Sequence, residues 1–154
     1  PKARAVKRGD EYVIVDGYNF LFAIPELRAA AESDIARARD VLVRLLCDYT
    51  AYTGRRAIAV FDAYRRAGGE GSVEEIGSVT VVYTKEKETA DSYIEKATYD
   101  RASEHTVRVV TSDMQEQLGV LGAGGLRVSA REFWAELSET SLSLRERIEA
   151  LKRG

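Results

Sequence analysis

The sequence predicts a single three-layer α/β/α domain with a mostly parallel sheet of five strands. Three observations support this prediction. The length of 154 residues suits one domain. Several short runs are apolar throughout rather than alternating, as in strands covered on both faces, and segments with helical periodicity separate these runs. Because 45% of the residues are apolar and 31% charged, a folded core is favoured over a disordered chain.

Apolar runs mark the expected strands. The five strands are predicted, in chain order, over residues 12–15, 57–61, 79–83, 107–110 and 126–128. The segment 64–78 has no such run and is rich in glycine, so it predicts a loop.

Helices are expected between these strands. A long amphipathic helix should follow a Ser33 cap, because apolar residues recur at three- and four-residue steps from Ile35 to Tyr52. Pro25 suits the first turn of a short helix over residues 24–32. Further helical patterns lie at residues 90–97, 114–121, 133–137 and 144–151. We therefore divide the chain into a basic N-terminal tail or linker (1–11), an α/β domain (12–138) and a C-terminal helix (139–154).

Charge and cysteine content exclude several classes of protein. The net charge is −2, and residues 1–11 hold four basic and two acidic residues, so the tail is +2 and the body is −4. An acidic body does not bind polyanions by bulk charge, so contact with nucleic acid would need local patches or metal ions. The single cysteine, Cys47, rules out an internal disulfide, and the short apolar runs rule out a membrane span. We expect a soluble, cytoplasmic protein.

Acidic residues follow the ends of three predicted strands. Asp16, Asp62 and Asp113 all come at the carboxyl ends of strands, which meet at one edge of a parallel sheet. Asp91, in the first turn of a predicted helix, can reach the same place. Four carboxylates repel one another unless a cation neutralises them, and oxygen ligands without His or Cys suit Mg²⁺ or Mn²⁺. The pattern therefore predicts metal-dependent hydrolysis of phosphodiesters.

Two of these aspartates also have purely structural interpretations. Asp16 before Gly17 can form an Asx turn, and Asp113 can cap a helix with Glu116. Taken singly, neither residue identifies a site, and the prediction depends on the convergence of the four.

Several motifs, in their order along the chain, resemble those of NYN domains in the PIN-like nuclease superfamily. They are Val15-Asp16-Gly17-Tyr18-Asn19, Val60-Phe61-Asp62, the segment 84–91 and Thr111-Ser112-Asp113. Residues 125–132 narrow the resemblance to the YacP-like branch, and the resemblance covers residues 12–137. It implies a PIN-like (Rossmann-like) fold with the sheet order 3-2-1-4-5. It also implies cleavage of single-stranded RNA assisted by Mg²⁺ or Mn²⁺, and association with ribosomes and translated mRNA.

The resemblance also implies roles for single residues. Asp16 and Asp91 are the expected principal metal ligands, with Asp113 completing the acidic cluster. Asn19 would position a phosphate or a metal-bound water, and Asp62 matches the second-strand position of the family. The expected auxiliary residues are Ser112, which could orient a metal-bound water, and Glu88. Turn formation is an equal alternative for Asn19 and Ser112.

Basic residues flank the predicted site and could contact RNA phosphates while Tyr18 or Tyr64 stacks on a base. The cationic candidates are Arg65, Arg66, Lys85, Lys87, Arg127 and Arg131. For each of them, an ordinary solvated surface residue is the alternative. His105, the single histidine, is expected on the surface at the opposite end of its strand, which excludes a metal-free mechanism with paired histidines.

We therefore expect a monomeric, metal-dependent endoribonuclease without a small-molecule cofactor that acts on mRNA at the ribosome. The alternative is a catalytically weak PIN-like module that docks on the ribosome or on RNA, as the terminal domain of a larger translation-associated protein. A receiver-like phosphoacceptor would need a lysine after the last strand, where the chain has Ser129-Ala130-Arg131. No G-x-G-x-x-G follows the first strand, which disfavours a dinucleotide site, whereas phosphatase activity on small esters stays open.

Overall fold

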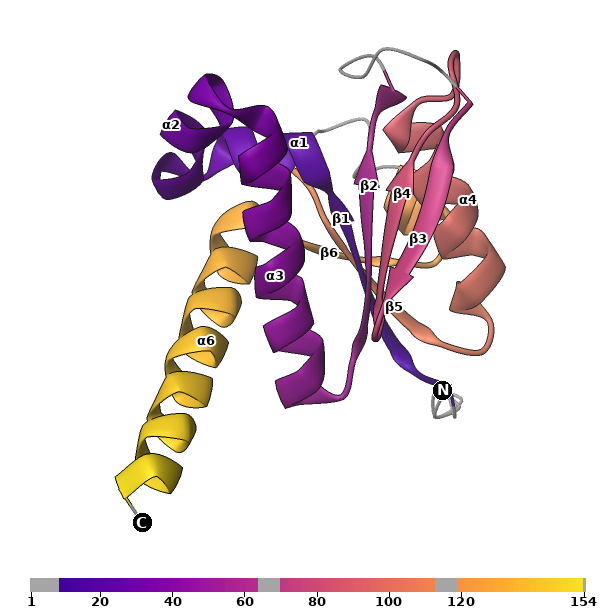
Figure 1. Cartoon of the computed structure of the whole chain (residues 1–154). Helices are drawn as coiled ribbons and strands as arrows, with labels where there is room; N and C mark the ends of the chain where they lie inside the picture. The colour runs from indigo at the N-terminus through magenta and orange to yellow at the C-terminus, as the bar shows by residue number, and fades with distance from the viewer. Residues whose placement is uncertain (1–8, 64–69, 113–118, 154) are drawn as a thin grey trace.

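The computed structural model of the chain describes residues 9–63, 70–112 and 119–153. Within these residues a six-stranded sheet lies between two layers of helices (Figure 1). The strands are β1 (Glu11–Asp16), β2 (Arg56–Phe61), β3 (Ser72–Ile76), β4 (Val79–Tyr83), β5 (Thr106–Val110) and β6 (Leu126–Val128). The helices are α1 (Gly17–Ala23), α2 (Pro25–Ser33), α3 (Ile35–Thr53), α4 (Ala90–Ala102) and α6 (Ala130–Arg153).

The sheet is mixed, with the strand order β3-β4-β2-β1-β5-β6. The five predicted strands are present as β1, β2, β4, β5 and β6, and they pair in parallel in the predicted relative order. The predicted number of strands was wrong, because β3 adds an antiparallel sixth strand at the edge, next to β4. Its residues fell within the segment that we expected to be a loop, and all five of them are exposed.

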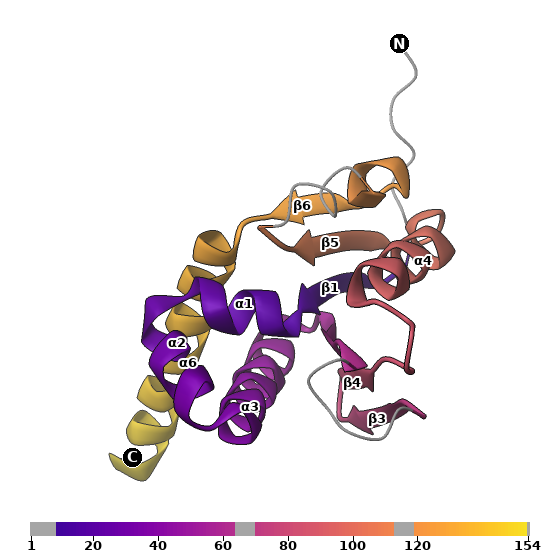
Figure 2. The same ribbon diagram turned by 90° about the horizontal axis from the view of Figure 1, so that it is seen from above.

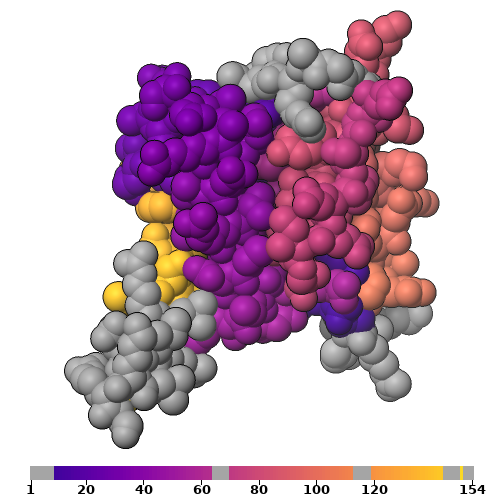
Figure 3. Space-filling model, viewed as in Figure 1, coloured from indigo at the N-terminus to yellow at the C-terminus, as the bar shows by residue number. Residues whose placement is uncertain are grey.

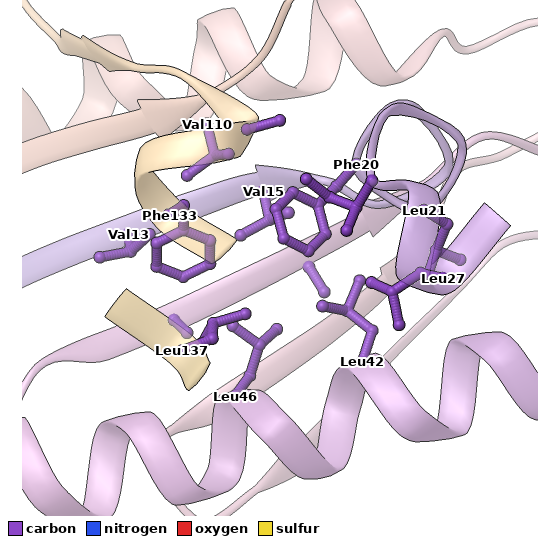
Figure 4. Close-up of a cluster of buried hydrophobic side chains, with 14 of the residues drawn as sticks. Val13, Val15, Phe20, Leu21, Leu27, Leu42, Leu46, Val110, Phe133 and Leu137 are labelled. Atoms are coloured by element: carbon purple, nitrogen blue, oxygen red, sulfur yellow. The ribbon is translucent and has the colours of Figure 1, made fainter. Parts of the chain in front are cut away.

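Two apolar clusters fill the space between the sheet and the helices. The larger one lies beneath α1, α2, α3 and α6 (Figure 4) and includes Val13 and Val15 of β1. The smaller one lies beneath α4, on the other face, and includes Ile14. Figure 2 shows α4 on the opposite side of the sheet from α1, α2, α3 and α6. Since successive residues of β1 are buried in different clusters, both of its faces need apolar side chains, which explains its unbroken apolar sequence.

Three helical features differ from the prediction. A short helix, α1, follows β1 directly, where we expected only a turn. Asp34 rather than Ser33 caps α3, since its Oδ1 accepts a hydrogen bond from the backbone N–H of Arg37 at 3.1 Å, whereas Ser33 is the last residue of α2. The helices expected over 133–137 and 144–151 form one continuous helix, α6. The start of the helix expected over 114–121 lies outside the described residues.

The structure also shows the surroundings of the single cysteine and the single histidine of the sequence. Cys47 is half-buried on α3, and burial together with the charge of Asp48 raises the pKa of its thiol. His105 precedes β5, at the end opposite the carboxyl edge as expected, but it is half-buried rather than a surface residue. Its Nδ1 accepts a hydrogen bond from the backbone N–H of Asp10 at 2.8 Å, and its ring packs edge-on against Tyr12. None of the described helices has an apolar stretch that could span a bilayer.

Candidate active site

A groove with a volume of about 470 Å³ opens at the carboxyl ends of β1, β2 and β5 and at the start of α4. It is lined by Asp16, Tyr18, Asn19, Phe22, Ala23, Asp62, Ala90, Asp91 and Ser112. The structure therefore brings together three of the four predicted aspartates and both predicted polar partners, as the rule for ligand sites in parallel sheets leads one to expect. The fourth aspartate, Asp113, lies outside the described residues.

Asp16 serves two purposes at the end of β1. It is the N-cap of α1, and its Oδ1 accepts a hydrogen bond from the backbone N–H of Asn19 at 3.4 Å. The side chain is half-buried and lines the groove. The cap thus holds the carboxylate in place at the groove, so the structural interpretation of Asp16 and the functional one are compatible.

Gly17 lets the chain turn from β1 into α1 close to the sheet. A Cβ atom at this position would overlap the ring of Phe61, the last residue of β2. Only glycine fits beneath α1 here, which keeps Asp16 and Asn19 near the strand ends.

Asn19 and Ser112 join the carboxyl ends of the neighbouring strands β1 and β5. Asn19 Oδ1 accepts hydrogen bonds from both the backbone N–H (3.2 Å) and the hydroxyl (3.1 Å) of Ser112. These bonds connect α1 with the residues that follow β5. Because Oδ1 is used in this way, the Nδ2 donors of Asn19 are the atoms that can reach a phosphate or a water.

Asp62 forms a hydrogen bond with the N-terminus of α4. Its Oδ2 accepts a hydrogen bond from the backbone N–H of Ala90 at 3.0 Å, and the Thr89 hydroxyl caps the same helix by accepting from the backbone N–H of Ser92 at 3.1 Å. Asp91 lies in this first helical turn, half-buried and in the groove lining. The position of Asp91 therefore depends on the carboxylate of Asp62.

The possible metal ligands in the groove are carboxylate and hydroxyl oxygens and the amide of Asn19. Such oxygen ligands suit Mg²⁺ or Mn²⁺ rather than zinc. Among the residues that the structure describes, however, three or more Asp, Glu, His or Cys side chains do not gather closely enough to hold a metal ion. Asp16 and Asp91 face one groove without forming a complete ligand set by themselves.

Tyr18 does not occupy the position predicted for a base-stacking residue. Its side chain is only 5% exposed, and its ring packs against that of Phe61 with the centroids 5.1 Å apart. Its hydroxyl accepts a hydrogen bond from Arg39 Nη1 at 3.1 Å. A nucleobase cannot stack on a ring that is buried in this way, so the predicted stacking role of Tyr18 was wrong.

The basic candidates that the structure describes lie outside the groove lining, and all of them are exposed. Lys85 and Lys87 belong to the turn before α4, which Glu88 closes by accepting a hydrogen bond from the backbone N–H of Lys85 at 3.1 Å. Glu88 is therefore a turn-forming residue here. Arg127 donates from Nε to the carbonyl of Thr111 at 3.3 Å, close to Ser112, whereas Arg131 lies in the first turn of α6. The other candidates, Tyr64, Arg65 and Arg66, fall outside the described residues.

Comparison with known proteins places this geometry in a family. The sequence profile of the YacP-like NYN domain matches residues 13–153. The chain is 39% identical over 139 residues to YacP of Bacillus subtilis (strain 168), covering 90% of this chain and 81% of that protein. The crystal structure of Rae1 (YacP) from Bacillus subtilis is similar with a TM-score of 0.80, 37% identity and coverage of 92% of this chain and 82% of that one. The crystal structure of a single-residue mutant of the same Rae1 protein is similar with a TM-score of 0.79 and 35% identity. The match covers 93% of this chain and 84% of that one. The chain therefore belongs to the YacP-like NYN domain family, a family of the nuclease type.

Proposed function

We propose that this chain is an endoribonuclease that hydrolyses phosphodiester bonds of single-stranded RNA with Mg²⁺ or Mn²⁺, and that it acts in the cytoplasm on mRNA in association with the ribosome. One observation carries the proposal: Asp16 at the end of β1, Asp62 just after β2 and Asp91 at the start of α4 line one groove at the carboxyl edge of the sheet. Membership of a nuclease-type family supports the same reaction.

The proposed metal ligands are Asp16 and Asp91, with Asp113 as the third carboxylate. When bound, the divalent cation would polarise a phosphoryl oxygen and lower the pKa of a bound water. The other residues of the groove position this set. Asp62 holds the helix turn that carries Asp91. Asn19 holds the ends of β1 and β5 together, and its Nδ2 can donate to a phosphate oxygen.

The RNA strand must also be held against the negative charge of the groove. We propose that the basic residues around this edge contact its phosphates, since such contacts depend little on base sequence. The residues concerned are Arg65, Arg66, Lys85, Lys87, Arg127 and Arg131.

The test is cleavage of an end-labelled single-stranded RNA by the wild-type chain and by the Asp16→Asn and Asp91→Asn variants. We expect internal cuts that require Mg²⁺ or Mn²⁺ and that slow by about a hundredfold or more in both variants, because each loses a charged metal ligand. Asp40→Asn is the matched control, since Asp40 is an exposed carboxylate on α3 outside the groove lining. It should cut at the wild-type rate.

A second candidate is a module that docks on the ribosome or on RNA with little catalysis of its own. The observation that favours it is that the described basic candidates, Lys85, Lys87, Arg127 and Arg131, are exposed and lie outside the groove lining. Cleavage should therefore be repeated on mRNA bound to translating ribosomes, alongside co-sedimentation with those ribosomes. Co-sedimentation without any cut above the background of the Asp16→Asn variant would reject the nuclease and favour docking.

A further inference from the structure

Arg39 on α3 lies beside the groove, although its sequence position gives no sign of it. Its Nη1 donates a hydrogen bond to the hydroxyl of Tyr18, a residue of the groove lining, at 3.1 Å. Its guanidinium carbon also lies 5.8 Å from the centroid of the Tyr83 ring, at the end of β4. In Figure 3 the surface of α3 meets the surface of the β3–β4 segment. Arg39 thus contacts a residue of the groove lining from the side of α3 and β4.

The guanidinium of Arg39 contacts two aromatic residues, Tyr18 and Tyr83, whose rings are joined by Phe61 packed between them. Tyr18 packs against Phe61 with the centroids 5.1 Å apart, and Phe61 stacks on Tyr83 at 5.4 Å with an interplanar angle of 24°. Phe61 is fully buried, and Tyr83 is half-buried. A planar guanidinium held by a ring and a hydroxyl is pre-organised, so it loses little freedom when it binds an anion.

The positive charge of Arg39 has only neutral partners in the described part of the chain. Its assigned contacts are a hydroxyl and an aromatic ring, and no ion pair joins it to a carboxylate of the described residues. Four other described arginines pair with Asp or Glu, namely Arg28, Arg55, Arg56 and Arg108, whereas Arg37 and Arg44 on the same helix form no ion pair with the described residues. A guanidinium has five N–H donors, and one of those of Arg39 is used by Tyr18. The remaining donors suit the two oxygens of a phosphodiester.

We propose that Arg39 is a phosphate-binding residue that holds the RNA backbone next to the nucleotide in the acidic groove. The proposal rests on the proposed function, which supplies single-stranded RNA as the ligand. An RNA strand with one phosphate at the carboxylates continues past them. A cation beside the groove would offset the repulsion of its next phosphate by Asp16, Asp62 and Asp91. Tyr83 supports the guanidinium instead of stacking on a base. This phosphate-binding position, formed by Arg39 and called the Arg39 subsite, therefore binds the RNA backbone whatever the base sequence.

The test measures RNA affinity as a function of salt concentration, by fluorescence anisotropy of a labelled single-stranded oligonucleotide without divalent cations. Arg39→Gln should weaken binding about tenfold, because a charge-assisted contact is lost. It should also reduce the slope of log affinity against log salt by about 0.7, the value for one phosphate contact to a single strand. Arg39→Lys should keep the wild-type slope. Arg44→Gln removes the same charge from an exposed position of the same helix and should leave affinity and slope unchanged.

Cleavage kinetics give a second readout. With Mg²⁺ or Mn²⁺, Arg39→Gln should raise KM about tenfold and leave kcat nearly unchanged, since a contact outside the groove binds the substrate and the transition state equally. A purely structural Arg39 would act through Tyr18. In that case Tyr18→Phe, which keeps the charge, would reproduce the loss of thermal stability and of kcat seen in Arg39→Gln, and the salt slope would not change. That result would overturn the proposal.

The failures of the two proposals can be told apart. If the wild-type chain cuts RNA and Arg39→Gln keeps the wild-type slope of log affinity against log salt, only the proposal of the Arg39 subsite is contradicted. A wild-type chain that binds RNA but does not cut contradicts the nuclease, and the slope then still decides on Arg39. A wild-type chain that neither binds nor cuts overturns both.

Discussion

At the scale of single residues, Gly17 is the position where the smallest change should matter most. A Cβ atom there would overlap the Phe61 ring, and Phe61 is held between Tyr18 and Tyr83. We expect Gly17→Ala to lower the free energy of unfolding by about 1–3 kcal/mol, the usual cost of overpacking a core, as measured by urea denaturation. RNA cleavage should fall as well, because Asp16 and Asn19 flank this position.

Gly122→Ala is the matched control for this prediction. A Cβ at position 122 would have no atom within 4 Å, so the substitution should leave the unfolding free energy unchanged or slightly raised. Equal stability of the Gly17→Ala variant and the wild type would mean that α1 can move away from β2, and our account of the tight turn would then be wrong.

Single residues also show which parts of the site can be predicted from sequence. The strand-end aspartates could be predicted, because they follow apolar runs whose direction fixes the edge on which they lie. Arg39 could not, since an arginine on an amphipathic helix resembles any solvated residue. The burial of Tyr18 depends on Phe61 and on Arg39, residues far from it in sequence, so local pattern could not reveal it either.

At the scale of elements, the start of α4 connects stability with the site. Asp62→Ala would leave the Ala90 N–H without its acceptor, and we expect the unfolding free energy to fall by about 1–2 kcal/mol. Asp62→Asn keeps an acceptor oxygen and should lose less than half of that amount. Thermal or urea denaturation of both variants measures the difference.

The same pair of variants determines the role of Asp62 in cleavage. If Asp62 acts by holding Asp91 in place, Asp62→Asn should cut RNA much faster than Asp62→Ala. Equal and severe loss of activity in both variants, with stability retained in Asp62→Asn, would show instead that the negative charge of Asp62 is needed at the metal or the phosphate.

The elements that sequence analysis missed share a physical cause. β3 has the sequence Ser-Val-Glu-Glu-Ile and is exposed along its whole length at the sheet edge, so it lacks the apolar run that marks a buried strand. α1 is a short helix with buried residues on several sides, including Gly17, Tyr18, Phe20 and Leu21, so it shows no amphipathic period. Both elements are stabilised by tertiary contacts and not by local preference.

At the scale of the whole molecule, the two ends of the sheet differ in their side chains. The carboxyl end carries the groove, whereas at the other end a network of polar side chains connects α3 and α6 with the strands. Arg55, just before β2, donates to Glu11 Oε2 at 2.6 Å and to the Tyr49 hydroxyl at 2.7 Å, and it lies 3.9 Å from Glu136 of α6. Arg108 of β5 reaches the same glutamate at 3.4 Å. Burial lowers the pKa of Arg55, but its hydrogen bonds to Tyr49 and Glu11 outweigh this effect, so the pKa is raised overall.

This separation predicts a variant that loses stability without losing the site. Arg55→Met removes the charge that joins β1, α3 and α6 and leaves the buried Tyr49 hydroxyl without its donor, so the free energy of unfolding should fall by about 1–3 kcal/mol. Arg28→Met is the control, because Arg28 and Glu32 form an exposed pair whose loss should cost less than about 0.5 kcal/mol. Below the unfolding transition, the cleavage rate of folded Arg55→Met should equal that of the wild type, since the groove lies at the opposite end of the strands. A proportional loss of kcat at a temperature where the variant is fully folded would instead mean that the network sets the spacing of the strand ends, and the two ends of the sheet would then be coupled.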